Sequence, residues 1–129
     1  MKQNYFLLVK VDDMKVQMKV VSFGNGSISE KLKFFYEALG CSSIDIVQFN
    51  REMDLIVDDE GLLFPNKPVF EIPSDLYTES LKIAGDFLVG KRILVPDEGY
   101  ETVGFESLQE MEEHFKATNL QFRLIGVTR

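Results

Sequence analysis

Histidine and cysteine, two residue types that often act in catalysis, occur once each in this chain. His114 is the only histidine, and it stands beside Glu110 and Glu113 on the polar side of an acidic, helix-like stretch. No second histidine or cysteine stands at metal-ligand spacing from it, so we expect a surface residue. Cys41, the only cysteine, follows a glycine and has no histidine near it in sequence, which favours a small, buried apolar role over a nucleophile. The sequence therefore predicts no catalytic residues.

Two acidic clusters raise the question of a metal site. Asp58, Asp59 and Glu60 are adjacent, and a second group of carboxylates lies at 97–101. A calcium loop takes its ligands from alternating positions over a longer segment than either cluster offers. We therefore interpret both clusters as solvated turns, and the sequence predicts neither a metal nor a cofactor.

A short loop holding two prolines is the best candidate for binding a ligand or partner. The prolines reduce the entropy lost on binding, while Phe64, Asn66 and Lys67 offer an apolar anchor, an amide and a charge. Gly85 and Asp86 form the second choice. In the competing interpretation the loop is only a turn and Phe64 plugs the core.

The elements that position these residues begin with two strand-like runs, at 5–11 and 15–21. We expect them to pair as a hairpin with the first run more central in its sheet, because it is apolar on both faces. In the second run Val16, Met18 and Val20 alternate with polar residues, which predicts that they face the core.

Two helices are expected, over 28–39 and 108–118. Each opens with a capping box, formed by Ser27 with Glu30 and by Ser107 with Glu110. The glycines around Asn25 form a turn, and no Lys-Ser/Thr pair follows them, so a phosphate-binding loop is not indicated. Gly40 ends the first helix.

The remaining strands fall between and after the helices. They are predicted at 44–49, 53–57, 69–72, 83–95, 100–105 and 120–127. The Asp58–Gly61 turn is expected to fold the next strand straight back. Gly85 and Gly90 indicate bulges or close backbone contacts in one long strand over 83–95.

Length and composition suit one α+β domain over residues 1–129, a mostly antiparallel sheet covered by two helices. Hydrophobic residues make up 45% of the chain, and eleven phenylalanines and four tyrosines supply bulk without tryptophan. The predicted core residues are Leu32, Phe35, Ile46, Leu55, Val57, Phe87, Val89, Met111 and Phe115.

Charge limits the partners. Fourteen basic and twenty-one acidic residues give a net charge of −7, which argues against direct binding of nucleic acid. The single cysteine, the lack of a charged-then-apolar leader and the shortness of every apolar run predict a cytoplasmic protein without a membrane segment.

Short motifs in the order Leu-Gly, an Ile-rich strand, Asp58-Asp59-Glu60-Gly61, Pro65-Asn66-Lys67 and Ile83-Ala84-Gly85-Asp86 carry a family resemblance. From 21 to about 105 the chain resembles domain-of-unknown-function family thirty-eight forty-six, small proteins frequent in phages, plasmids and conjugative elements. Lys67 stands where the family has arginine. Lysine keeps the positive charge but lacks the planar guanidinium that binds an anion through two parallel hydrogen bonds, so this sequence does not predict that the family's arginine role is kept.

The resemblance and the lack of a catalytic constellation favour a non-catalytic accessory protein of a phage or mobile element that binds a host protein or a small molecule. The alternative is an acidic nucleic-acid mimic that inhibits a nucleic-acid-binding enzyme, a hypothesis based on charge alone. A hydrolase or transferase is the third hypothesis.

Overall fold

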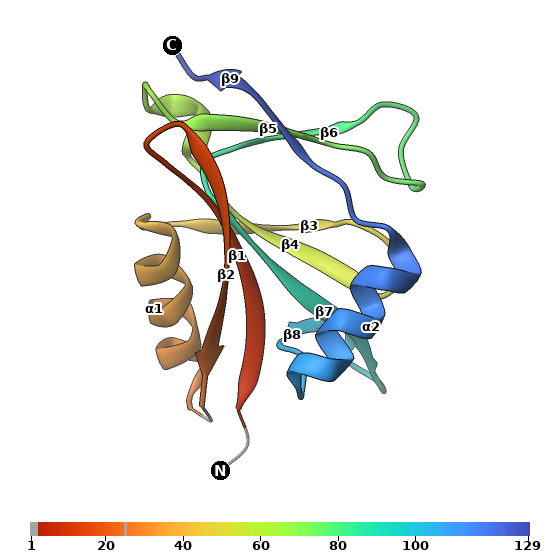
Figure 1. Cartoon of the computed structure of the whole chain (residues 1–129). Coiled ribbons are helices and arrows are strands. Elements are labelled where there is room, and N and C mark those ends of the chain that lie inside the picture. Colours follow the sequence, from red (N-terminus) through yellow and green to blue (C-terminus); the bar gives the residue numbers. More distant parts are fainter. Residues whose placement is uncertain (1–2, 25) are drawn as a thin grey trace.

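The computed structural model describes residues 3–24 and 26–129, so Asn25 lies outside the described residues. In chain order the elements are β1 (Asn4–Asp12), β2 (Lys15–Phe23), α1 (Ile28–Leu39), β3 (Ile44–Gln48), β4 (Met53–Asp58), η1 (Gly61–Leu63), β5 (Pro68–Ile72), β6 (Leu81–Ala84), β7 (Phe87–Val95), β8 (Gly99–Val103), α2 (Leu108–Thr118) and β9 (Arg123–Val127). The single α+β domain predicted from the sequence is confirmed (Figure 1).

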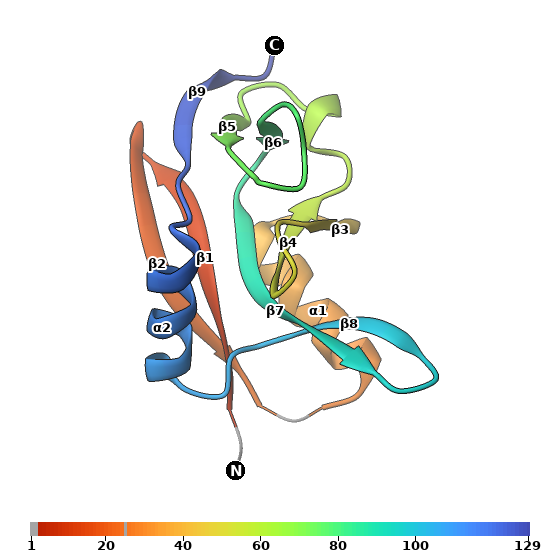
Figure 2. The same ribbon diagram turned by 90° about the vertical axis from the view of Figure 1, so that its right-hand side faces the viewer.

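The strands form two antiparallel sheets. The larger has the order β2-β1-β7-β4-β3, and β8 extends it by pairing with β7; the smaller has the order β6-β5-β9. Figure 2 shows α1 and α2 on opposite sides of the larger sheet, with the smaller sheet above. The β1–β2 hairpin and the central place of β1 are confirmed.

On one face of the larger sheet, α1 packs through Phe35 and Leu39. The ring of Phe35 meets that of Phe6 edge to face, at 5.3 Å between centroids. The capping box of Ser27 and Glu30 opens the helix, and Gly40 closes it in the left-handed conformation, as predicted.

On the other face, the smaller sheet and α2 enclose the larger part of the core. Phe70 of β5 and Phe87 of β7 stack edge to face at 5.2 Å, which joins the two sheets. Met111 of α2 is buried in the same cluster. The side chain of Ser107 accepts a hydrogen bond from the Glu110 amide and so caps α2. The reciprocal half of the predicted capping box is not formed, because the Glu110 carboxylate binds Lys91 instead.

Two strand predictions were wrong. The run over 83–95 is two strands, because Gly85 takes φ 101° and turns the chain from β6 in the smaller sheet to β7 in the larger one. The turn over 58–61 leads into η1 instead of a returning strand. There a Cβ on Gly61 would lie 2.1 Å from the Ala84 carbonyl oxygen, so glycine permits this close contact.

Most of the predicted core is buried, but Ile46 is 40% exposed, because it lies on the edge strand β3. Leu32 and Phe115 are half-buried. Val16, Met18 and Val20 point to the core side of the sheet, opposite Val11, Val9 and Leu7 of β1. They are nevertheless exposed, because β2 is the outermost strand.

Candidate ligand-binding cleft

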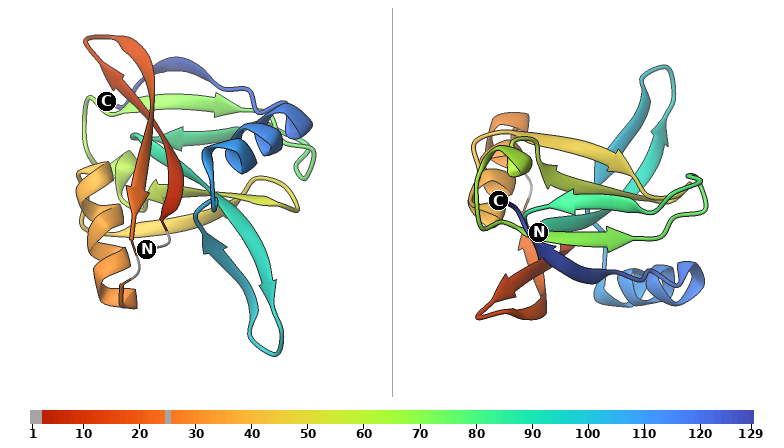
Figure 3. Two further views of the ribbon diagram at one scale, coloured as in Figure 1. Left: turned by 60° about the horizontal axis from the view of Figure 1, so that its bottom comes forward. Right: turned by 90° about the horizontal axis from the view of Figure 1, so that it is seen from above.

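A cleft of about 470 Å³ separates α1 and β3 from the arm formed by β7 and β8. Figure 3 shows this arm projecting from the body of the molecule. One wall is apolar and the other is polar, which is the arrangement expected of a small-molecule site. The apolar wall consists of Ile28, Leu32, Phe35, Ile44 and Ile46, and the polar wall of Asp54, Arg92, Tyr100, Glu101 and Thr102, with Lys31 between them.

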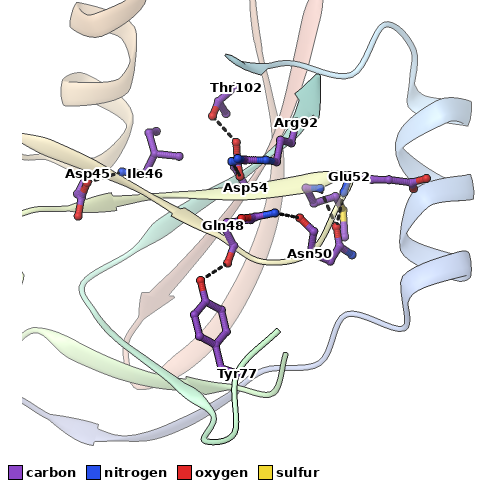
Figure 4. Close-up of polar contacts among 10 residues, drawn as sticks. Asp45, Ile46, Gln48, Asn50, Glu52, Asp54, Tyr77, Arg92 and Thr102 are labelled. Carbon is purple, nitrogen blue, oxygen red and sulfur yellow. Dashed lines mark hydrogen bonds and ion pairs between the residues drawn. The ribbon is translucent and has the colours of Figure 1, made fainter. Parts of the chain in front are cut away.

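Asp54 lies on the polar side of the cleft and is 1% exposed. Its Oδ1 lies 3.1 Å from Nη1 of Arg92, and its Oδ2 accepts a hydrogen bond of 2.5 Å from the Thr102 hydroxyl (Figure 4). The register explains this meeting, because Arg92 and Thr102 are directly opposite across β7 and β8 while Asp54 pairs with Gly90. Because both oxygens of this carboxylate have partners, the free-energy cost of removing it from water is offset.

Arg92 is fixed from three directions. Its backbone amide donates to the Glu52 carbonyl at 2.7 Å, its guanidinium pairs with Asp54, and the guanidinium carbon lies 4.2 Å from the centre of the Tyr100 ring. This last contact has cation–π geometry. In the described part of the chain, the buried Nε of Arg92 has no hydrogen-bond partner.

Lys31 reaches the cleft from α1. Its ammonium donates to the Thr102 carbonyl oxygen at 2.7 Å and lies 3.9 Å from Glu101. Burial lowers the pKa of Lys31 below its ordinary value, although the charge of Glu101 acts in the opposite direction. The cation is thus partly removed from water while its nearest carboxylate remains at the limit of an ion pair.

A second hollow, of about 240 Å³, adjoins the cleft at Lys31 and extends toward Phe23 and Gly24. The nearby start of α1 is occupied by its own capping box. Ser27 Oγ accepts from the Glu30 amide at 3.1 Å, and a Glu30 oxygen lies 3.3 Å from the Ser27 amide nitrogen. This geometry offers no support for an anion at the helix start.

The five residues singled out from the sequence gather at another part of the molecule. The ammonium of Lys67 lies 6.0 Å from the Phe64 ring centre, and the Gly85 amide donates to the Pro68 carbonyl at 2.7 Å. Asp86 accepts from the Val11 amide at 3.3 Å, and burial raises the pKa of its carboxyl.

The backbone of this loop is tied to the end of the chain. The amide of Asn66 donates to the Thr128 carbonyl at 3.0 Å, and the amide of Lys67 donates to the Thr128 hydroxyl at 2.9 Å. Asn66 itself takes φ 63°, which asparagine tolerates well. Phe64 is 48% exposed, so it does not plug the core. A hollow of about 420 Å³ lies beside this loop.

His114 and Cys41, the two residues considered for catalysis, have surroundings that favour structural roles. His114 is half-buried, so it is less exposed than predicted; its ring meets Phe105 edge to face at 5.3 Å, and Nδ1 lies 3.1 Å from the Glu110 carbonyl oxygen. Cys41 is half-buried beside the hollow at Phe64. Burial, with the nearby charge of Asp58, raises the pKa of its thiol, which disfavours the reactive thiolate.

The cleft was not predicted from the sequence, although one signal for it was present. Asp54 interrupts an otherwise apolar strand, and a charge in a buried strand calls for a buried partner. The partner, Arg92, stands far along the chain and is brought close only by the pairing of β4 with β7.

Within the described residues, no three histidine, cysteine, aspartate or glutamate side chains converge in a way that would hold a metal ion. Neither α1 nor α2, the helices in the described ranges, has the length and apolar character needed to cross a membrane.

Comparison with known proteins places the chain by family. No curated protein and no solved structure shows significant similarity to it. A family model described as Domain of unknown function (DUF3846) matches residues 4–116, which include every residue of the cleft and leave out β9. The resemblance found in the sequence is confirmed, and the chain belongs to the DUF3846 family.

Proposed function

We propose that this protein is a non-catalytic binding protein whose cleft takes a small organic anion with an apolar body. The main support for the proposal is the position of Lys31, a half-buried cation between an apolar wall and the Arg92–Tyr100 pair. A ligand with an apolar body and one anionic group complements both walls at once.

The charges of the cleft support an anionic ligand. Both oxygens of Asp54 are engaged, one by Arg92 and one by Thr102. Glu101 approaches Lys31 only to 3.9 Å. A carboxylate or sulfonate that accepts a direct hydrogen bond from the ammonium would offset the cost of its burial.

The same contacts support binding over reaction. Asp54 is 1% exposed, and each of its oxygens holds a residue of the polar wall in place, Arg92 on one and Thr102 on the other. The packing of Tyr100 against Arg92 limits the motion of the guanidinium. Both arrangements prepare the polar wall before a ligand arrives, which reduces the free-energy cost of binding.

The proposal includes a biological setting. The role as an accessory protein of a phage or mobile element is supported by the motif resemblance described above. A cytoplasmic location is supported by the single cysteine of the chain. Of the two partner classes considered from the sequence, the shape and chemistry of the cleft favour the small molecule over a host protein.

Anilinonaphthalene sulfonate, an organic anion with an aromatic body, is a suitable probe. Its affinity for the protein is measured by fluorescence titration with Lys31→Met and with Lys33→Met, an exposed lysine of the same helix that pairs with Glu37. Loss of one charge-assisted hydrogen bond should weaken binding to Lys31→Met by roughly tenfold or more. Binding to Lys33→Met should match the wild type.

A groove on the other face of the sheet needs its own control, because it is apolar and holds about 490 Å³. Leu108 lines this groove and is 55% exposed, so Leu108→Ser leaves the core intact. The proposal predicts that Leu108→Ser binds the probe as the wild type does. If Leu108→Ser abolishes binding and Lys31→Met does not, the cleft is not the site.

A further inference from the structure

The strand β2 is an open edge of the larger sheet. It pairs with β1 over nine residues without any shift in register, and its other side has no partner strand in the described structure. Six consecutive residues, Lys15 to Val20, are exposed. A long, regular and partly apolar edge strand is a template for pairing with another strand.

The alternation of hydrogen-bonded and non-hydrogen-bonded pairs along the hairpin shows which peptide groups of β2 are free. A two-residue turn at Asp13 and Met14, both with positive φ, joins Asp12 to Lys15, and the residues that close such a turn form a hydrogen-bonded pair. Bonding then alternates along the ladder. The peptide groups of Val16, Met18, Val20 and Ser22 therefore point away from β1, and none of them meets another described group in a hydrogen bond.

The edge at β3 is protected, in contrast to β2. The Asp45 carboxylate accepts from the outward amide of Ile46 at 2.9 Å, and the Tyr77 hydroxyl donates to the outward carbonyl of Gln48 at 2.8 Å (Figure 4). Such contacts hinder the addition of another strand.

The edge at β8 is protected in a similar way, because the Lys31 ammonium donates a hydrogen bond to the Thr102 carbonyl oxygen. In the smaller sheet, the pairing of β9 shifts register at a bulge. Bulges also discourage strand addition. Unlike β3, β8 and β9, β2 is an open edge.

The sequence of β2 is complementary to itself in one register. With Met18 opposite Met18 of a second, antiparallel copy, Val16 faces Val20 of that copy, and Lys19 faces Gln17. This register pairs outward-pointing peptide groups with each other, as the ladder requires. It also places the apolar side chains of both copies on the same face of the joined sheet.

The neighbouring registers bring like charges together. A shift of two residues one way sets Lys19 opposite Lys19, and the same shift the other way sets Lys15 opposite Lys19. Like charges directly opposite each other destabilise an antiparallel pair. Charge therefore favours the register centred on Met18 over both of these shifts.

We propose that two copies of this chain associate through antiparallel pairing of β2 with β2, centred on Met18, so that the larger sheet continues across the dimer. The pairing satisfies the free peptide groups of Val16, Met18 and Val20 and covers their side chains, which are 40%, 65% and 44% exposed. The occupant of the edge is thus a second copy of the chain.

Sedimentation velocity over a range of protein concentrations tests the pairing. Met18→Pro removes the central outward N–H, which β1 does not use, so the monomer tolerates it as edge strands tolerate proline. We expect the wild type to dimerise and the variant to do so roughly tenfold more weakly or not at all. The matched control is Leu62→Lys, which removes an equally apolar residue, 77% exposed, from η1.

A second variant keeps the test possible if Met18→Pro does not fold. If circular dichroism shows that Met18→Pro is unfolded, Met18→Lys replaces it, because this change sets two lysines opposite each other at the centre of the pairing. The proposal is overturned if the wild type stays monomeric at every concentration. It is equally overturned if folded Met18 variants dimerise as the wild type does.

Cross-linking tests the register itself, in a Cys41→Ser background. Directly bonded antiparallel residues have Cα atoms about 5.5 Å apart, within the range of a disulfide. Met18→Cys should therefore cross-link to itself under oxidation. Val16→Cys should not, because the two Val16 residues lie roughly 14 Å apart, but it should cross-link to Val20→Cys when the two proteins are mixed. Self-cross-linking of Val16→Cys in preference to Met18→Cys would refute the register.

Discussion

Asp54 is the residue on which the cleft depends, since it joins three strands through its side chain. It lies on β4, pairs with Arg92 on β7 and accepts from Thr102 on β8. These contacts hold the β7–β8 arm against the sheet and orient Tyr100 through Arg92. A buried charge of this kind is stable only while its partners remain.

Removal of that carboxylate should destabilise the protein. Asp54→Ala leaves Arg92 partly buried without its counter-charge, and the expected loss in the free energy of unfolding is about 3 kcal/mol. Urea denaturation measures the effect, with Asp59→Ala as the control because Asp59 is exposed. An Asp54→Ala midpoint equal to that of the control would show that the buried pair does not support the fold.

Lys31 should lower the free energy of unfolding, because its charged form is partly buried in the folded state. Burial lowers its pKa in the folded state below the unfolded value of 10.5, so the folded state releases its proton first. The unfolding free energy should therefore rise as the pH increases toward 10.5. Lys31→Met should lose this rise, whereas Lys33→Met should keep it. Identical pH profiles for the two variants would refute the assignment.

At the scale of the elements, the arm and α2 are fastened by a charged pair. Lys91 of β7 lies 2.6 Å from a carboxylate oxygen of Glu110 on α2. Burial acts to raise the pKa of Glu110, but the hydrogen bond and charge of Lys91 outweigh it, and the pKa is lowered from 4.5.

That shift predicts a pH dependence. A lowered pKa in the folded state stabilises the fold above the unfolded value, and the benefit is lost as the pH falls through the folded value. The wild type should thus be more stable than Glu110→Gln at neutral pH, and the difference should shrink below pH 4.5. Thermal unfolding across this range measures it, with Glu113→Gln as the control. A difference that persists in acid would contradict the assignment.

The elements were largely predictable because their signals are local. The two Ser-x-x-Glu boxes located both helices, and alternation located the first hairpin. The division of 83–95 at Gly85 was not predictable, because a glycine with positive φ and a glycine in a bulge look alike in sequence. Only the packing of two sheets decides between them.

At the scale of the whole molecule, the arrangement of the sheets creates the cleft. The cleft combines residues of α1, β3, β4, β7 and β8, which are distant in sequence. The loop at Phe64, Asn66 and Lys67 was easier to notice because its residues are consecutive. Its backbone, however, is engaged by Thr128, which leaves its side chains as the groups available to a partner.

The binding of an anion in the cleft is tested most directly by locating a bound anion on the wild-type protein. Heteronuclear NMR spectra recorded during titration with anilinonaphthalene sulfonate report which backbone amides respond. We expect the largest shifts at Lys31, Ile46, Tyr100 and Thr102, with little change at Asn66 and Lys67. Shifts concentrated at Leu108 and Met111, or at Asn66 and Lys67, with the cleft amides unmoved, would contradict it.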